Sequence, residues 1–278
     1  MNALEIKQLS RSFTGFQLDN IDLTVPSGCI VGLIGENGAG KSTTIKLILD
    51  ILHKDSGSIR IFGQDNEKDM ALLKEDIGVV MDEAGIPECL TAKQVGKVMK
   101  YSFRRWDEAE YVRLLKKLSL PDNKPFKELS RGMKMKLGIA IAMSHKAKLL
   151  LLDEPTSGLD PVVRDEVVEM FYEFTREEDH SILISSHIVS DLERLCDYVA
   201  FLHKGKLLLF EEKDKLLSEY GIIHCTVDQL GGIGKVKYKK ETPYGAEIIV
   251  SRKDAPEGFA ISPISIEELF VFMVKEAR

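Results

Sequence analysis

Apolar and polar side chains alternate along the first part of the chain, as at Ile21 and Asp22. A period of two is typical of a strand with one buried face. A similar stretch precedes it, and the Thr14-Gly15 pair between the two stretches favours a turn. Residues 3–25 are therefore predicted to form two antiparallel strands.

Short runs dominated by apolar residues occur at four further places and have the length of buried strands. Segments with helical periodicity separate them along the chain. Strands that alternate with helices in this way predict an α/β fold. The four runs are residues 29–34, 77–81, 149–152 and 181–186.

Two parts of the chain depart from this α/β pattern. Between about residues 84 and 146 strand signals vanish, and the periodicity predicts a helical subdomain inserted between two strands of the sheet. Beyond about residue 220, short strand-like stretches and a terminal helical stretch predict a small α+β extension. We therefore expect a main domain over residues 1–220 and an extension over residues 221–278, whose role the sequence leaves open.

The sequence GENGAGKST follows the first apolar run and fits the phosphate-binding pattern G-x-x-x-x-G-K-[ST]. Glycine permits the positive φ angles with which successive N–H groups face one anion. Lys41 would reach the β- and γ-phosphates of a nucleotide, and the Ser42 hydroxyl would coordinate Mg²⁺. The residues expected to contact the nucleotide here are Gly35, Asn37, Gly38, Ala39, Gly40, Lys41, Ser42 and Thr43.

The leucine run at residues 149–152 ends in two acids, Asp153 and Glu154. Burying two acids with no base beside them is costly. The pair makes sense if the same site also holds a cation and a phosphate. It therefore predicts a polyphosphate-binding element elsewhere in the chain, and the glycine-rich loop supplies one.

Composition and charge narrow the class of protein. Of the 278 residues, 44% are hydrophobic and 29% are charged, as in an ordinary globular protein, and the net charge of −6 argues against a nucleic-acid-binding surface. No stretch approaches 18 consecutive apolar residues and the first residues lack a secretion signal, so we expect neither a membrane span nor export. The cysteines lack metal or redox spacing and are expected to be reduced thiols in a cytosolic protein.

Further segments complete a family pattern: LSRGM at residues 129–133, LLLLDEP at residues 149–155 and SGLD at residues 157–160, with His187 downstream. With the phosphate loop, they resemble the ATP-binding subunits of ATP-binding-cassette (ABC) transporters, over most of the main domain. The resemblance points to the bacterial branch that pairs with separately encoded permeases of the ABC-2 exporter type. It implies a P-loop NTPase core of the ABC type and a head-to-tail dimer with two ATP molecules between its subunits.

The resemblance implies roles for the acids and for the histidine. Asp153 would hold Mg²⁺, and Glu154 would polarise the attacking water. His187 would contact the γ-phosphate. The catalytic residues would thus be Lys41, Glu154 and His187.

The LSRGM segment would act on the ATP of the partner subunit. Ser130 is a good N-cap residue, and the helix that starts beside it would present its positive end, with Gly132, to that nucleotide. Arg131 and Met133 depart from the family's usual LSGGQ. Arg131 would add a charge contact to the partner's nucleotide or point to solvent, and the sequence does not choose between them.

Two further expectations concern the base and the metal. Phe13 would stack on adenine, although Phe16 is close enough to compete for this role. Asp82 stands where the family usually has glutamine, and it would bind Mg²⁺ through water.

Two functions fit these motifs. The first is an ATPase that powers a separately encoded permease, with export of peptides or drugs preferred, from the cytoplasmic face of the membrane. Its helical subdomain would grip the permease, with Tyr101, Phe103 and Trp106 as anchors or as ordinary core residues. The alternative is a soluble ATPase of the same fold that acts as a switch on a ribosome or DNA. A single cassette, no coiled coil and the acidic net charge weigh against this alternative.

The expected cofactors are therefore ATP and Mg²⁺. The expected partners are a second ATPase subunit, identical or homologous, and an integral-membrane permease. No nucleic-acid partner is expected.

Overall fold

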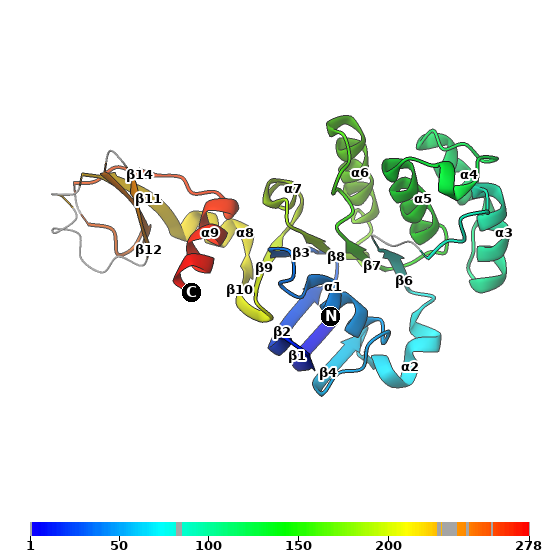
Figure 1. The fold of residues 1–278 in the computed structure, drawn as a ribbon, viewed down its shortest axis with the longest axis horizontal. Coiled ribbons are helices and arrows are strands. Elements are labelled where there is room, and N and C mark those ends of the chain that lie inside the picture. Colours follow the sequence, from blue (N-terminus) through cyan, green and yellow to red (C-terminus); the bar gives the residue numbers. More distant parts are fainter. Residues whose placement is uncertain are drawn as a thin grey trace.

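The strands of the computed structural model form three sheets over the residues that it describes (Figure 1). The described residues are 2–81, 85–226, 229, 238–242, 245–256 and 258–277. The first sheet has the order β2-β1-β4-β5 and contains the predicted hairpin, with Ile6 opposite Leu23 in antiparallel register. The expected antiparallel N-terminal subdomain is confirmed. Its strands are β1 (Asn2–Phe13), β2 (Phe16–Pro26), β4 (Ser56–Ile61) and β5 (Gln64–Asp65).

The second sheet is central and has the order β10-β9-β3-β8-β7-β6. Strands β9, β3, β8, β7 and β6 run parallel, and β10 pairs antiparallel with β9. Parallel strands end at the same edge, so the ends of β3, β7 and β8 lie side by side there. The predicted α/β fold is confirmed. The strands are β3 (Ile30–Gly35), β6 (Ile77–Val80), β7 (Leu149–Asp153), β8 (Ser181–Ser186), β9 (Tyr198–His203) and β10 (Lys206–Glu212).

Apolar cores lie on both faces of the central sheet. Leu151 of β7 packs in a core shared with α1 and the N-terminal sheet, whereas Leu150 packs in the core formed with α6, α7 and α5 (Arg131–Met143). A strand buried on both faces needs apolar residues at successive positions, which explains the leucine run. The helices outside the helical subdomain and the C-terminal extension are α1 (Lys41–Ile48), α2 (Asn66–Leu73), α6 (Pro161–Phe174) and α7 (Val189–Leu195).

From residue 85 to residue 148, the described chain between β6 and β7 forms helices joined by turns and one isolated β-bridge. Its last helix, α5, packs on β6, and α3 and α4 lie further from the sheet (Figure 1). The buried Tyr111 hydroxyl of α4 donates to the Ala92 carbonyl of α3 at 2.8 Å, which joins these helices. The helices are α3 (Ala92–Ser102), α4 (Glu108–Lys117), η1 (Phe126–Glu128) and α5 (Arg131–Met143).

The last part of the chain forms a third sheet and a terminal helix that project to one side (Figure 1). The sheet order is β12-β13-β11-β14, and α9 packs on α7 of the main domain. The predicted α+β character of this part is therefore present. Its elements are α8 (Lys213–Glu219), β11 (Tyr220–Cys225), β12 (Tyr238–Thr242), β13 (Gly245–Ser251), β14 (Ile261–Ser262) and α9 (Ile266–Glu276).

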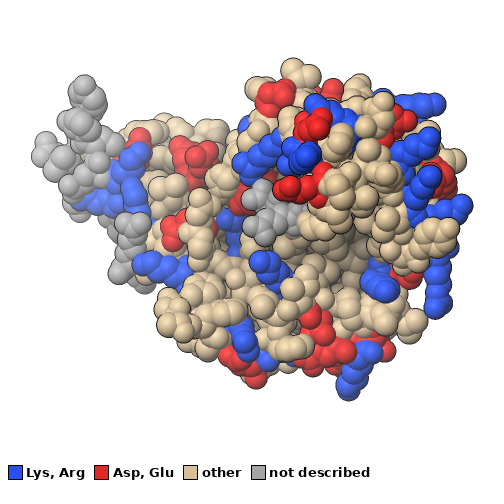
Figure 2. Space-filling view, turned by 45° about the vertical axis from the view of Figure 1, so that its right-hand side comes forward, with Lys and Arg blue, Asp and Glu red and all other residues tan. Residues whose placement is uncertain are grey.

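The character of the helices and the distribution of surface charge both bear on function. None of the helices within the described residues is long and apolar enough to cross a bilayer. Basic and acidic side chains are interspersed over the face of the molecule seen in Figure 2. That face therefore lacks the basic stripe that is typical of nucleic-acid binding.

Candidate active site

The glycine-rich loop joins the end of β3 to the start of α1 at the carboxyl edge of the central sheet. Gly40 has φ +112°, and a Cβ atom there would lie 2.9 Å from Phe16 Cζ, so both backbone conformation and space require glycine. The turn between β9 and β10 supports the loop through the Gly205 N–H, which donates to the Ala39 carbonyl at 2.9 Å. The loop is thus held in place directly before the N-terminus of α1. Such a cradle is suited to an anion.

Lys41 begins α1, and its side chain is only 6% exposed. Its Nζ atom donates to the Gly35 carbonyl at 2.7 Å and to the Glu36 carbonyl at 3.3 Å. It also lies 3.1 Å from Glu154 Oε1. The structure therefore joins the phosphate loop directly to the acidic end of β7.

Asp153 and Glu154 follow the leucines of β7 and have different surroundings. Asp153 is 4% exposed and accepts a hydrogen bond from the Ser185 hydroxyl of β8 at 2.6 Å. Glu154 has φ +52°, and its N–H donates to the Ser185 carbonyl at 3.1 Å. The bend turns the Glu154 carboxylate toward Lys41, while Asp153 stays fixed between the strands.

His187 follows the end of β8 and meets the same carboxylate. Its Nδ1 atom lies 2.7 Å from Glu154 Oε2, and its backbone N–H donates to that oxygen at 3.3 Å. Because an ionised carboxylate only accepts hydrogen bonds, Nδ1 carries the hydrogen in this contact. The structure thus brings together Lys41, Glu154 and His187, which the sequence predicts as the catalytic residues.

The LSRGM segment begins α5 and packs on the SGLD loop before α6. The Ser130 hydroxyl caps α5 by accepting from the Met133 N–H at 3.2 Å. A Cβ atom on Gly158 would lie 2.9 Å from Arg131 Nη1, so the guanidinium covers this glycine. A Cβ atom on Gly132 would lie 3.4 Å from Leu159 Cδ2. The LSRGM segment and the SGLD loop therefore form one surface.

The two aromatic candidates for the base differ in exposure. Phe13 is 37% exposed, and the Arg11 guanidinium lies over its ring at 5.3 Å from the ring centroid. Phe16 is partly buried against the core beside Gly40. Phe13 therefore has the more accessible ring. Asp82, the third expected metal ligand, lies outside the described residues.

Comparison with known proteins places this geometry in a family. The sequence model described as "ABC transporter" matches residues 18–157. The ABC transporter ATP-binding protein YtrB of Bacillus subtilis is 34% identical over 226 residues, which cover 81% of this chain and 77% of YtrB. The chain belongs to the ABC transporter family. It is one of the family's ATP-binding proteins and hence an ATPase.

Two further similarities agree with this assignment. The lantibiotic transport ATP-binding protein SrtF of Streptococcus pyogenes is 38% identical over 215 residues, covering 76% of this chain and 91% of SrtF. A solved structure of an ATP-binding subunit of an ABC transporter is 31% identical, with a TM-score of 0.70, and the match covers 77% of this chain and 91% of that one. The prediction that the chain is an ATP-binding protein of the ABC transporter family, with the fold of an ABC ATPase, is therefore confirmed.

One residue of the candidate active site was not predicted from the sequence. Ser185 holds Asp153 through its hydroxyl and Glu154 through its carbonyl. The only local signal is its position two residues before His187 in SILISSH. Its role depends on the register of β8 against β7, in which Asp153 lies opposite Ser185.

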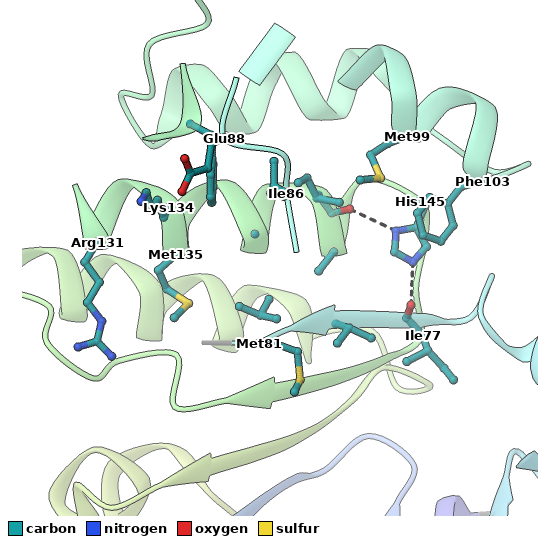
Figure 3. A pocket seen from close by; sticks show the side chains of 16 residues that line it. Ile77, Met81, Ile86, Glu88, Met99, Phe103, Arg131, Lys134, Met135 and His145 are labelled. Carbon is teal, nitrogen blue, oxygen red and sulfur yellow. Dashed lines mark hydrogen bonds between the residues drawn. The ribbon is translucent and has the colours of Figure 1, made fainter. Parts of the chain in front are cut away.

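A cavity of about 650 Å³ lies between β6, α3 and α5 (Figure 3). Its wall is mostly apolar, and Glu88, Arg131 and Lys134 are its charged lining residues. His145 closes one end, with Nε2 3.0 Å from the Ile77 carbonyl and its ring stacked on Phe103. Burial lowers the pKa of His145. The cavity lies beside the contact of α5 with β6, and neither Lys41 nor Glu154 lines it.

Proposed function

We propose that this ATPase binds ATP with Mg²⁺ at the edge of its central sheet and powers a separately encoded export permease at the cytoplasmic face of the membrane. The observation that carries this proposal is the Glu154 carboxylate, held between Lys41 and His187 beside the phosphate loop. An acid in this position can orient water toward a phosphate that the loop holds. Peptides or drugs are the preferred cargo class, because the relative SrtF is named for lantibiotic transport.

ATP binding would engage the loop, Lys41 and the exposed aromatic ring. The N–H groups at the start of α1, in Lys41, Ser42 and Thr43, have no partner within the helix and would bind phosphate oxygens. The Lys41 ammonium group would leave the Glu154 carboxylate and contact the β- and γ-phosphates instead. Phe13 would stack on adenine, since the Phe16 ring already packs on the core beside the loop.

Hydrolysis would then rely on groups that the chain already holds in place. Glu154, once released by Lys41, would accept a hydrogen bond from the attacking water. His187 would keep its contact with Glu154 and approach the γ-phosphate, which aligns the acid with the phosphate. Phosphoryl transfer depends on such positioning and on charge neutralisation more than on covalent chemistry.

The residues at the edge of the sheet also suit Mg²⁺. Ser42 lies in the first turn of α1, which packs on β7, and Asp153 ends that strand. A hydroxyl and a carboxylate oxygen, together with phosphate oxygens, are the hard ligands that Mg²⁺ prefers. We assign Ser42 and Asp153 as ligands, and Asp82 stays a proposed ligand through water. The bound ion would neutralise charge on the β- and γ-phosphates.

A second ATPase subunit would complete each site. Ser130 and Gly132 lie at the N-terminus of α5, away from the chain's own Lys41–Glu154 pair in sequence, and they form one surface with the SGLD loop. The positive end of α5 would meet the γ-phosphate of ATP bound to the partner. Hydrolysis would therefore require a dimer, of identical or homologous subunits.

The permease would dock on the helical subdomain, which we place at residues 84–146 within a main domain of residues 1–220. Tyr101 is 93% exposed, and Phe103 lines the cavity of Figure 3. Trp106 instead packs on Tyr111, with ring centroids 4.9 Å apart. Tyr101 and Phe103 are therefore the proposed anchors for cytoplasmic helices of the permease, and Trp106 belongs to the core.

Fractionation of native cells tests this proposal. We expect the chain to sediment with membranes and to leave them with detergent, together with an integral-membrane protein. Replacing Tyr101 and Phe103 by alanine should move the chain to the soluble fraction, whereas Val112→Ala, at another exposed apolar position of the subdomain, should not. A chain that is soluble without detergent and fully active would favour the ribosome or DNA switch. The mixed charges of Figure 2 and the net charge of −6 weigh against that alternative.

A further inference from the structure

The short helix α7 follows the histidine of the active site. His187 contacts Glu154 through both its backbone N–H and its ring, and α7 begins two residues later at Val189. The intervening turn is fixed by the Ile188 N–H, which donates to the Ser186 hydroxyl at 2.9 Å. With so little chain between them, a shift of α7 must move His187.

The C-terminal extension is seated on this helix. Glu193 of α7 accepts a hydrogen bond from the Ile266 N–H, the first of α9, at 3.2 Å. This N–H is one of those that a helix cannot satisfy internally, and a carboxylate suits the positive end of the helix. Leu192 of α7 and Leu269 of α9 lie in the same buried cluster. A carboxylate hydrogen bond and a shared apolar cluster thus join the extension to the helix behind His187.

A second contact binds the extension to the central sheet beside α7. The rings of Phe201 in β9 and Phe270 in α9 meet edge to face, with centroids 5.3 Å apart. Within the main domain, Lys213 Nζ at the start of α8 donates to the Glu193 carbonyl at 3.0 Å, so Glu193 is held at its backbone as well as at its carboxylate. The extension therefore contacts both α7 and the neighbouring strand β9.

On its other side α7 is tied to α6. Arg164 of α6 lies 3.5 Å from Asp191, and Arg194 lies 3.4 Å from Asp165 of α6. The Tyr172 hydroxyl of α6 donates to the Arg194 carbonyl. Because α6 begins directly after the SGLD loop, α7 is clamped between the helix behind that loop and the C-terminal helix.

We propose that the C-terminal extension sets the position of α7, and through it of His187, and that Glu193 is the positioning residue that transmits this effect. The proposal rests on the proposed role of His187 in hydrolysis. It gives the extension a function in the rate of hydrolysis rather than in nucleotide binding, because neither Glu193 nor α9 adjoins the phosphate loop. Movement of the extension, by a partner or by the permease, would then change the rate of ATP hydrolysis.

Substitutions of Glu193 in the full-length ATPase test the proposal. Glu193→Ala removes the acceptor of the Ile266 N–H, and we expect kcat to fall by roughly three- to thirty-fold, less than the roughly hundredfold that a 1 Å misplacement can cost. The Kd for ATP should not change. Glu193→Gln keeps an acceptor oxygen and should retain most of the activity. Glu267→Gln, at an exposed position in the first turn of α9, is the matched control and should behave as the wild type.

A double-mutant cycle with His187 tests whether Glu193 affects kcat through His187. If Glu193 acts through His187, the Glu193→Ala change should have little further effect on kcat in the His187→Ala background. Equal effects of Glu193→Ala in both backgrounds would overturn the proposal, as would a lower melting temperature with an unchanged kcat. If His187→Ala alone leaves kcat unchanged, the proposed role of His187 fails instead. The two failures are therefore distinguishable.

Discussion

Replacing Glu154 by glutamine removes the charge that holds Lys41 at the end of β7. Lys41 Nζ lies 3.1 Å from Glu154 Oε1, and both side chains are largely buried. At an effective dielectric constant of about 20, the Coulomb attraction at this distance is about 5 kcal/mol before desolvation. The net value of a hydrogen bond to a charged group is smaller, about 1.5–3 kcal/mol. Glutamine keeps an acceptor oxygen, so we expect a gain in ATP affinity of about tenfold, or about 1.4 kcal/mol.

The same substitution should abolish most of the hydrolysis. A residue that acts as general base contributes about 10²–10⁴-fold to the rate, so kcat of Glu154→Gln should fall by at least about 10²-fold. The variant should accumulate as an ATP-bound dimer, because binding is retained and turnover is not.

Binding and turnover are measured separately for this variant. A fluorescent ATP analogue titrated in the presence of EDTA gives Kd without hydrolysis, and phosphate release with Mg²⁺ gives kcat. Glu169→Gln, at an exposed position of α6, is the matched control. Lys41→Ala should weaken ATP binding, whereas Glu154→Gln should strengthen it. Normal turnover of Glu154→Gln would refute its catalytic role, and an unchanged or weaker Kd would refute the restraint of Lys41 by Glu154.

Three other predictions address the partner site, the SGLD loop and stability. A Ser130→Arg subunit mixed with wild type should lower the activity of the shared sites, and strictly additive activities would exclude a composite site. Gly158→Ala places a Cβ atom 2.9 Å from Arg131 Nη1 at φ +69°, so kcat should fall, and Arg131→Gly should restore part of it in a double-mutant cycle of phosphate release. Burial lowers the pKa of His145, so the unfolded chain binds more protons and stability is lost as the pH falls below the ordinary value of 6.5. The melting temperature of His145→Gln should therefore drop less than that of wild type between about pH 7.5 and 5.5, whereas His224→Gln, at a 58% exposed side chain, should follow the wild type.

The parts of the site that local patterns encode were predictable from the sequence. The phosphate loop depends on glycines at fixed spacing, and Gly40 has the positive φ that this pattern requires. Asp153 and Glu154 follow a leucine run, and such runs indicate strands buried on both faces. The buried acids predict a phosphate site beside them, and the Lys41–Glu154 distance agrees with this expectation.

The contacts that depend on register and on packing between distant segments were not predictable. Ser185 supports Asp153 only because β8 pairs with β7 in one particular register. The seat of α9 on Glu193 depends on how two helices from different parts of the chain approach each other, and no local pattern records this. The sequence likewise left open whether Trp106 is an anchor or a core residue. The contact of its ring with the tilted ring of Tyr111 is a tertiary contact.

The backbone of Glu154 links nucleotide binding to the surface that would face the partner subunit. A non-glycine residue at φ +52° stores about 1–3 kcal/mol of strain, which surrounding contacts must offset. Ser185, Lys41 and His187 provide these contacts. ATP would compete for Lys41 and so remove one of them.

The SGLD loop is tied to Glu154, because the N–H of Ser157, its first residue, donates to the Glu154 carbonyl at 3.1 Å. The loop continues to Gly158, which Arg131 of the LSRGM segment covers. A change in the Glu154 backbone would therefore reach Arg131 through two direct contacts. In the proposed dimer, this path runs from the chain's own ATP to the residues that meet the ATP of its partner. The two sites would then respond to each other even without movement of the permease.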